Sequence, residues 1–594
     1  MKAKYFNSVI IAFMTLTSTA SVNASELESN KTPLTPTSIS VGADSYLITS
    51  KNHKALYIYD KATNVLKSEI LFDLPVTGVK LEGNTAYVTS SYEKGKLSKV
   101  NITTGEIEKT VDAGMGAMYP ILSNDKQKVF VCNQFKGTVQ AFNTSDLSLN
   151  GEVAVHREPC AAAITQDDKY LYVNNHLPLQ RADLDYVAAD VSIIDLTTMT
   201  KVKDVKLDNG SNALRDMALS VDGKYVFVSH NLGRFQVPTS QLQQGWMNTS
   251  AVSVIDVATQ TFLGSVLFDE PERGAAGIWG IDVDGNDIIV SHSGTHDISI
   301  LKYDAFKEKF ENTADRSKLS YDLYFLYGMR TRLTLVGNGP RDVEIDNGVV
   351  YVPTYFSDTL NIVNIENKEI DTTIALHPNR VQTDADKGEM YFNDATYCFQ
   401  NWQSCNGCHP GDGRTDGMNW DLVNDGIGNS KNCKSMLLSH VTAPSMISGI
   451  RETAELAVRK GFTHIQFAQV PDHVPNCVDK YLKGLKALPS PFLVNGELSE
   501  TAKAGRKVFE KYKCDDCHSG PYFTDLKMYV IGDDVEFEKG WDTPTLIEVW
   551  RTAPYLFDGR ATTLEEVFGV HKHGIDGKIS KKDLNALSEY VRSL

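Results

Sequence analysis

Short runs that alternate β-branched or aromatic residues with polar ones recur between residue 40 and about residue 380. A turn of Asp, Gly, Asn or Lys leads into each run, and each run ends in valine. These valines are Val88, Val131, Val173, Val228, Val290 and Val352. A second run commonly follows, as at 252–256, and often closes on an Asp-x-x-Thr turn. Alternation with a period of two residues predicts β-strands.

The spacing of these runs predicts a propeller. The terminal valines recur at intervals long enough for one four-stranded blade each, and an earlier unit at 45–60 brings the number to seven. Each blade buries its faces against its neighbours, so a closed ring leaves no long exposed edge. The runs resemble the YVTN-type propeller repeat, and an array of β-sandwiches is the alternative. We expect a mainly β, seven-bladed β-propeller over 25–380.

From residue 381 onward, helix-forming segments alternate with loops rich in Gly, Asp and Cys, and the region repeats itself. The pattern CxxCH occurs at 405–409 and again at 514–518. Thr-Ala-Pro occurs at 442–444 and again at 552–554, at almost the same offset, and each copy precedes an amphipathic segment. The duplication predicts an α-helical domain of two tandem modules.

The predicted domain spans 381–594, with modules at about 381–490 and 491–594. CxxCH is the attachment sequence of c-type haem, because its thiols add to the porphyrin vinyl groups and its histidine binds the iron. The attachment residues are Cys405, Cys408 and His409 in the first module, and Cys514, Cys517 and His518 in the second. We expect two covalently bound haem c groups in a di-haem cytochrome c domain. The alternative is a redox or zinc-binding cysteine pair before a histidine.

Several predicted blades carry a histidine just after the run that ends in valine. These residues are His176, His230 and His292, with His296 close by. They predict either a copper or zinc site at one mouth of the channel or ordinary polar lining. Arg157, Arg215 and Arg341 stand at the start of inner strands. They could bind an anion or satisfy carbonyl groups of the blades.

The 594-residue chain has a formal net charge of −16, which argues against a nucleic-acid partner or an anionic membrane surface. Lys2, Lys4, the apolar stretch 9–16 and the small-x-small sequence 22–24 predict a signal peptide over 1–24. The mature protein is then expected in the periplasm. We expect no transmembrane anchor, since no later stretch is long and apolar enough.

Five of the nine cysteines lie outside the CxxCH motifs: Cys132, Cys160, Cys398, Cys433 and Cys477. An oxidising compartment allows up to two disulfides among them. Cys132 with Cys160 is the pair we favour, because both fall near inner strands of adjacent blades. Buried free thiols are the alternative.

The region 385–594 resembles the bacterial di-haem cytochrome c peroxidase and MauG family. The likeness rests on Thr-Pro-Thr-Leu at 543–546, Thr-Ala-Pro-Tyr at 552–555 and the segment 558–566, together with 388–409. The resemblance implies that the first haem, at His409, reacts with peroxide. It implies that the second haem, at His518, is six-coordinate and relays electrons.

The resemblance also implies distal ligands. The family's ligand to the second haem follows the helix around 564–566, a place taken here by His571, with His573 as the fallback and Met528 as a third candidate. At the first haem, either the iron is open or His464 closes it, and His440 is a further option.

The resemblance suggests further site residues. Glu455 corresponds to Glu565 when the modules are aligned on Thr-Ala-Pro, and it could be the acid that helps to cleave peroxide. Trp420 matches the family's aromatic residue between the haems, and Trp402 is the other choice. Core packing or a solvated surface is the alternative for each. Family members bind Ca²⁺ between modules, which the acidic residues Asp412, Asp416 and Asp421 permit.

The leading functional hypothesis is a periplasmic peroxidase or MauG-like oxidoreductase that reduces hydrogen peroxide at the first haem. Its electron donor would be a small redox protein, either a cytochrome c or a cupredoxin, or a protein substrate docked on the propeller. The second hypothesis is an electron-transfer cytochrome whose propeller binds a partner. The third places the enzyme site in the propeller channel, with the haems as electron acceptors.

Overall fold

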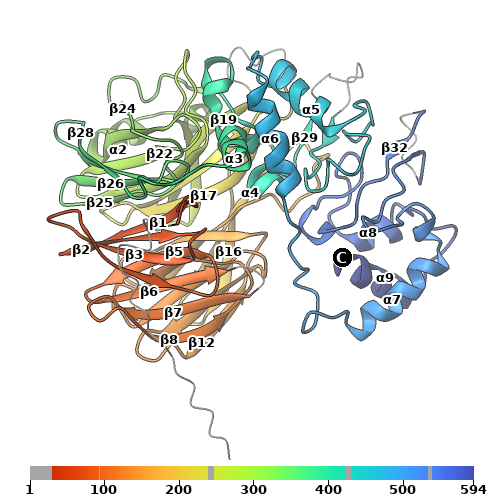
Figure 1. Cartoon of the computed structure of the whole chain (residues 1–594), viewed down its shortest axis with the longest axis horizontal. Helices are drawn as coiled ribbons and strands as arrows, with labels where there is room; N and C mark the ends of the chain where they lie inside the picture. The colour runs from red at the N-terminus through yellow and green to blue at the C-terminus, as the bar shows by residue number, and fades with distance from the viewer. Residues whose placement is uncertain (1–29, 92–93, 238–246, 422–429, 533–537) are drawn as a thin grey trace, which may run out of the picture.

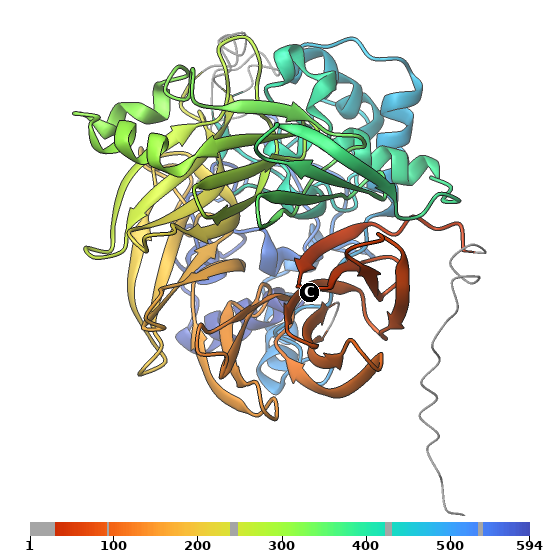
Figure 2. The same ribbon diagram turned by 90° about the vertical axis from the view of Figure 1, so that its left-hand side faces the viewer.

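The computed structural model describes residues 30–91, 94–237, 247–421, 430–532 and 538–594. The predicted signal peptide lies outside these residues. Seven four-stranded antiparallel sheets form a ring, and a helical region stands beside it (Figures 1 and 2). The predicted seven-bladed propeller is therefore confirmed.

Each blade consists of four consecutive strands. Blade 1 is β1 (Pro36–Val41), β2 (Ser45–Ser50), β3 (Ala55–Asp60) and β4 (Leu66–Leu71). Blade 2 is β5 (Val76–Glu82), β6 (Thr85–Ser91), β7 (Gly95–Asn101) and β8 (Glu106–Ala113). Blade 3 is β9 (Ala117–Leu122), β10 (Lys128–Asn133), β11 (Thr138–Asn143) and β12 (Leu149–Ala154). Blade 4 is β13 (Pro159–Ile164), β14 (Tyr170–Asn175), β15 (Asp190–Asp195) and β16 (Thr200–Lys206).

The remaining three blades follow the same order. Blade 5 is β17 (Ser211–Leu219), β18 (Tyr225–Gly233), β19 (Asn248–Asp256) and β20 (Thr261–Leu267). Blade 6 is β21 (Ile278–Asp284), β22 (Asp287–His292), β23 (Asp297–Lys302) and β24 (Thr331–Thr334). Blade 7 is β25 (Glu344–Asp346), β26 (Val349–Thr354), β27 (Thr359–Asn364) and β28 (Glu369–Ala375). Between β23 and β24 lie α2 (Tyr303–Glu311) and η2 (Arg316–Tyr321).

Burial differs between the inner and the outer strands of a blade. The first strands of consecutive blades contact one another around the ring, so they line the central channel. The runs that end in valine are the second strands, which are buried on both faces between blades. Fourth strands such as β8 and β16 are largely exposed, and their charged residues keep these edges from pairing with other chains.

Carboxylates close the ring between blade 7 and blade 1. Asp358 accepts hydrogen bonds from the backbone N–H groups of Leu34 (2.8 Å) and Thr35 (3.0 Å). Asp342 accepts one from Ile39 at 2.8 Å. These bonds join the first strand to the last blade although no strand is exchanged between blades.

The helical region contains the same elements twice. The first copy has α3 (Asp384–Asn393), α4 (Pro410–Gly413), β29 (Asn419–Trp420), β30 (Lys431–Asn432), α5 (Ala454–Lys460), the π-helical turn η6 (Gly461–Ile465) and α6 (His473–Gly484). Its short 3₁₀ turns are η3 (Ala395–Tyr397), η4 (Phe399–Asn401) and η5 (Cys405–Gly407). The second copy has α7 (Glu500–Lys511), η7 (Cys514–Asp516), β31 (Met528–Tyr529), β32 (Trp541–Asp542), η8 (Val549–Arg551), α8 (Leu564–Gly569) and α9 (Lys581–Arg592).

The first and last helices of each copy cross at a glycine. A Cβ on Gly388 of α3 would lie 2.0 Å from the carbonyl oxygen of Cys477 in α6. A Cβ on Gly505 of α7 would lie 1.8 Å from the carbonyl oxygen of Ala586 in α9. Only glycine permits so close an approach of two helix backbones. The duplicated sequence therefore produces duplicated helix packing.

The favoured disulfide is wrong, because neither Cys132 nor Cys160 forms a disulfide. Cys132 is buried in an apolar cluster between blades 3 and 4. The Sγ of Cys160 instead lies 3.3 Å from the carbonyl oxygen of Leu214 in the neighbouring blade. Both residues serve as small core side chains. Within the described residues, no helix has the length and apolar character needed to cross a bilayer.

Candidate haem-binding sites

Each CxxCH motif borders a largely apolar cavity. The first cavity, about 230 Å³, is lined by Cys405, Cys408 and His409 and by His464. The second, about 260 Å³, is lined by Cys514, Cys517 and His518 and by His573. Both motifs form a 3₁₀ turn, which brings the two thiols and the imidazole to the same side of the chain.

Both motif histidines are oriented by the backbone. The Nδ1 atom of His409 lies 3.0 Å from the carbonyl oxygen of Arg414, and that of His518 lies 3.1 Å from the carbonyl oxygen of Phe523. A proton on Nδ1 makes this bond and leaves Nε2 free to bind a metal. Burial lowers the pKa of both imidazoles, which favours the neutral form that a metal requires.

The second cavity passes a further test of fit for a bis-histidine metal. The ring centroids of His518 and His573 are 6.3 Å apart. An imidazole nitrogen lies about 1 Å from its ring centre and binds a metal at about 2 Å, so two imidazoles that would hold one metal between them have ring centres about 6 Å apart. The residues present therefore fit an iron between these two histidines.

His571, the predicted distal ligand, is not among the residues that line either cavity, whereas its fallback His573 is. His464 and His573 each follow the motif histidine of their own module at the same distance along the chain. This equal spacing was the sequence signal that could have identified the pair. The offset between the two Thr-Ala-Pro sequences pointed instead to Gly461, because α5 continues into the π-helical turn whereas α8 ends at Gly569.

The two cavities differ in how closely the second histidine approaches. Among the described residues, His518 and His573 form a ring contact, while His409 and His464 form none. His464 is exposed on the π-helical turn. His440 is engaged elsewhere, since its Nε2 lies 3.0 Å from Asp479. The motif histidine of the first cavity is therefore less closely paired with a second histidine than that of the second cavity.

The other predicted site residues lie outside the space between the cavities. Trp420 lines only the first cavity, donates a hydrogen bond to Asp416 (2.8 Å) and packs against Gly233 of the propeller. Trp402 is fully buried. Glu455 lines neither cavity, and its hydrogen bond with Lys483 lowers the pKa of its carboxyl to about 2. That value leaves Glu455 without a proton to donate near neutral pH.

Sequence reasoning missed the wall that the cavities share. Its residues are Asn432, Cys433, Lys434, Ser435, Leu437, Ile447 and Thr545. The Sγ atom of Cys433 lies 3.5 Å from Nδ1 of His409. This wall contains no aromatic side chain, so electron transfer between groups in the two cavities would cross a short stretch of loop.

A chain of buried ion pairs connects the propeller to the first motif histidine. Glu158 of the propeller pairs with both Nε (3.0 Å) and Nη2 (3.2 Å) of Arg551. Arg551 lies 3.6 Å from Glu548, which holds Arg414 through two bonds of 2.9 Å. The carbonyl oxygen of Arg414 is the partner of His409. The orientation of His409 therefore depends on both modules.

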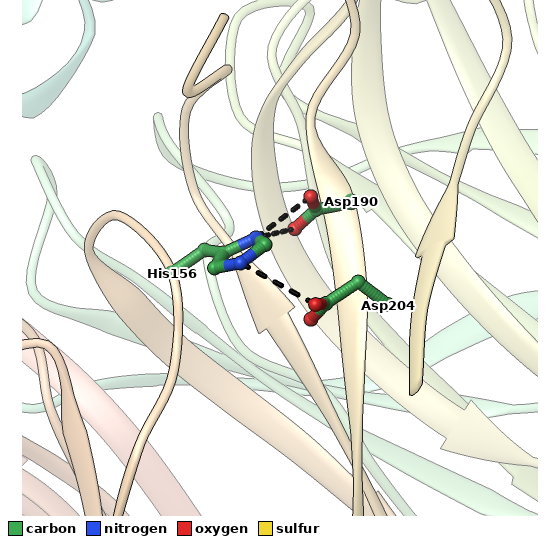
Figure 3. Close-up of side chains that lie close together, drawn as sticks. All are labelled: His156, Asp190 and Asp204. Atoms are coloured by element: carbon green, nitrogen blue, oxygen red, sulfur yellow. Dashed lines mark hydrogen bonds and ion pairs between the residues drawn. The ribbon is translucent and has the colours of Figure 1, made fainter. Parts of the chain in front are cut away.

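One group of side chains among the described residues has the proximity of a metal site: His156, Asp190 and Asp204 (Figure 3). The ammonium group of Lys201 already lies 2.9 Å from Nε2 of His156 and 2.7 Å from Asp204. The group is therefore an ion-pair cluster, and the hydrogen bond with Asp190 raises the pKa of His156. It holds the loop that carries Arg157 and Glu158.

The other predicted metal sites do not assemble among the described residues. Asp412, Asp416 and Asp421 form no such group. The blade histidines form no such group either, because they lie on or just after second strands and bond to neighbouring strands or blades. His176 bonds to the carbonyl oxygen of Leu214 (2.8 Å), His230 to Ser253 (2.7 Å) and His292 to Ser299 (2.8 Å).

Comparison with known proteins gives two curated relatives, and no protein-family model matches the chain. It is 26% identical to hydrazine synthase subunit gamma of Kuenenia stuttgartiensis over 274 residues, 35% of this chain and 76% of that subunit. It is 23% identical to subunit beta of the same organism over 180 residues, 29% of this chain and 46% of that subunit.

A solved structure of Kuenenia stuttgartiensis hydrazine synthase shares the fold. The TM-score is 0.51 at 19% sequence identity, over 56% of this chain and 96% of that chain. The chain is thus similar to hydrazine synthase subunits and has a seven-bladed propeller. The comparisons do not support the likeness to the peroxidase and MauG family.

Proposed function

We propose that this chain is an exported two-haem c-type oxidoreductase with one closed and one open site. The observation that carries the proposal is the pairing of His518 with His573 across the second cavity, without a matching ring contact in the first among the described residues. Similarity to two hydrazine synthase subunits supports an oxidoreductase that works with protein partners.

The residues of the two cavities would have separate roles. Cys405, Cys408 and His409 would attach one haem, and the equivalent residues of the second module would attach the other. When bound, the two haems would supply one-electron chemistry, with relay at His518 and substrate reaction at His409. The carbonyl groups of Arg414 and Phe523 fix the tautomer of each histidine. The linings of both cavities are largely apolar.

Two substrate classes remain candidates for the open site. Hydrogen peroxide follows from the sequence resemblance, and a small nitrogen compound follows from the names of the relatives. A closed first site, with His464 as its second ligand, would instead make the chain an electron-transfer cytochrome with the propeller as its binding module. The donor in each case would be a small redox protein.

Low-temperature electron paramagnetic resonance of the holoprotein, with haem content measured in parallel, tests this proposal. We expect two haems per chain, one with a low-spin ferric signal and one with a high-spin signal. The substitution His573→Ala should convert the low-spin signal to high spin, whereas the matched control His571→Ala should leave it unchanged. Loss of the low-spin signal in His571→Ala alone would refute the assignment. Two low-spin signals in the native protein would favour the electron-transfer function.

A further inference from the structure

We propose that Arg215 and Arg341 form a binding site for a small planar oxyanion, such as nitrate, nitrite or a carboxylate, where the propeller channel meets the first helical module. Arg215 lies on β17 and Arg341 shortly before β25, the channel-lining strands of blades 5 and 7. Trp279, on the channel-lining strand of blade 6, lies between them in blade order.

The two guanidinium groups stack on the same ring. The Cζ of Arg215 lies 3.9 Å from the ring centroid of Trp279, and that of Arg341 lies 4.2 Å from it. Arg341 also stacks on Tyr355 at 3.8 Å. Stacking fixes each guanidinium plane while leaving its N–H edge available for a ligand.

Both arginines have spare hydrogen-bond donors. Arg215 donates through Nη2 to the side-chain oxygen of Asn406 at 2.7 Å, and Arg341 donates through Nη2 to that of Asn393 at 3.1 Å. In the described part of the chain, neither guanidinium bonds a blade carbonyl or lies within 4 Å of a carboxylate. The Nε of Arg341 is buried without a partner. Each guanidinium has five N–H donors. Most of the ten donors of Arg215 and Arg341 together therefore have no hydrogen-bond partner within the described residues.

The local charges favour an anion. Burial is the main cause that lowers the pKa of Arg215 to about 10, and the positive charge of the neighbouring Arg341 lowers it further. Two carboxylates are nearby, those of Asp412 and Glu389. Lys51 is the main partner that lowers the pKa of Asp412, and the hydroxyl of Tyr355 donates to Glu389 at 3.1 Å. Arg341 also contributes to lowering the pKa of both acids, but it forms no ion pair with either of them.

A planar oxyanion matches this geometry because a guanidinium presents paired donors to two coplanar oxygens. Asn406 is the second residue of the first CxxCH motif, so the bound anion would sit next to the first cavity. The site goes beyond the proposed redox function, since none of its residues is assigned to haem attachment. Anion binding can therefore fail while the redox assignment holds, and the reverse is also true.

Isothermal titration calorimetry of the holoprotein with sodium nitrate tests the site, at an ionic strength held constant with sodium chloride. We expect saturable binding of one nitrate per chain. Arg215→Gln and Arg341→Gln should each weaken the affinity at least tenfold. Arg316→Gln is the matched control, because Arg316 also stacks on an aromatic ring, Phe310, but lies outside the channel. It should leave the affinity unchanged.

Three outcomes would overturn the proposal. The first is no heat beyond that of chloride, and the second is unchanged affinity in both glutamine variants. The third is a nitrate-dependent change in haem absorption whose midpoint concentration of nitrate is the same in native protein and variants. Such a result would place nitrate on iron. If circular dichroism shows that a glutamine variant does not fold, Arg341→Lys replaces it. This variant keeps the positive charge but lacks the paired N–H donors of a guanidinium, so its affinity for nitrate should fall tenfold. An unchanged affinity for nitrate would also overturn the proposal.

Discussion

At the scale of single residues, the orientation of His409 depends on a carboxylate far along the chain. Its Nδ1 partner is the carbonyl of Arg414, and Glu548 of the second module holds the guanidinium of Arg414 through two hydrogen bonds. Both side chains are buried, with exposed fractions of 5% and 1%. Removing one member of such a pair leaves the other charge buried and unpaired.

We predict that Glu548→Gln destabilises the helical region by roughly 3 kcal/mol. The buried Arg414 would lose its counter-charge, and the loop that presents its carbonyl to His409 would loosen. Thermal unfolding followed at the Soret band measures the loss. The electron paramagnetic resonance signal of the first haem should change, while that of the second stays the same. An unaltered melting temperature would contradict this account.

Glu455→Gln provides the contrasting case and tests the acid role suggested by resemblance. Its pair with Lys483 is partly exposed, so the substitution should cost less than about 1 kcal/mol. Because Glu455 lines neither cavity, any peroxide turnover by the holoprotein should be unchanged. A hundredfold loss of turnover, measured by stopped-flow absorbance, would show that the carboxyl acts on substrate.

At the scale of elements, each helical module depends on the crossing of its first and last helices. Gly505 brings α7 against the backbone of α9, and Phe509 packs edge-on against Tyr590 at 5.4 Å. The same pair of contacts occurs in the first module, where Gly388 crosses α6 and Phe392 contacts Tyr481 at 5.4 Å. The crossing positions the CxxCH turn that comes after the first helix in each module.

We predict that Gly505→Ala destabilises the second module by at least about 2 kcal/mol, because a Cβ would overlap the carbonyl of Ala586. Gly461→Ala is the matched control, since no heavy atom lies within 4 Å of its added Cβ. It should be neutral or slightly stabilising. Soret-monitored thermal unfolding compares the two, and equal melting temperatures would show that the helices are not so close.

In the propeller, Asp269 connects β19 to the loop that follows β20. Its carboxylate accepts hydrogen bonds from the backbone N–H groups of Ser250 and Ala275, both at 2.7 Å. Burial outweighs these bonds and raises the pKa of Asp269 to about 6. The folded state therefore holds this proton more tightly than the unfolded state does.

It follows that Asp269 makes the propeller less stable as pH rises. Its favourable contribution is complete below pH 4 and is lost between about pH 4 and pH 6, by up to roughly 3 kcal/mol. Asp269→Asn cannot titrate, so the difference in free energy of unfolding between native protein and variant should shrink over this range. Urea unfolding followed by circular dichroism measures it, and a constant difference would contradict the direction of the shift.

At the scale of the whole molecule, the propeller loop around Arg157 binds the second helical module. Arg157 donates to the carbonyl oxygens of Arg551 and Ala553, beside the second Thr-Ala-Pro turn. Glu158 pairs with the guanidinium of Arg551. The ion-pair cluster around His156 fixes the base of this loop (Figure 3). The helical modules are thereby docked on one face of the ring (Figures 1 and 2).

We predict that Arg157→Ala loosens this docking without unfolding either part. Amide hydrogen exchange should speed up at least tenfold around 549–555 and stay unchanged in the blades. Lys67→Ala is the control, because Lys67 forms a partly exposed pair with Asp60 in blade 1. Equal exchange rates in the two variants would show that the loop does not secure the interface.

The sequence by itself determined the local structure. Strand alternation and spacing specified seven blades, and the repeated motif specified the positions of two cavities with His409 and His518 on their walls. It also contained the equal spacing from motif histidine to second histidine that identifies His464 and His573. These features depend on neighbours within one strand, turn or module, so a pattern of residue types is sufficient to specify them.

Only the tertiary structure decided which distant groups meet. It placed His573 rather than His571 in the cavity, left Cys132 and Cys160 unpaired, and turned the blade histidines toward neighbouring strands instead of the channel. It also joined Arg215 and Arg341 on one tryptophan. Side-chain direction depends on helix length, strand order within a blade and the docking of modules. A spacing in sequence does not encode these three-dimensional relations.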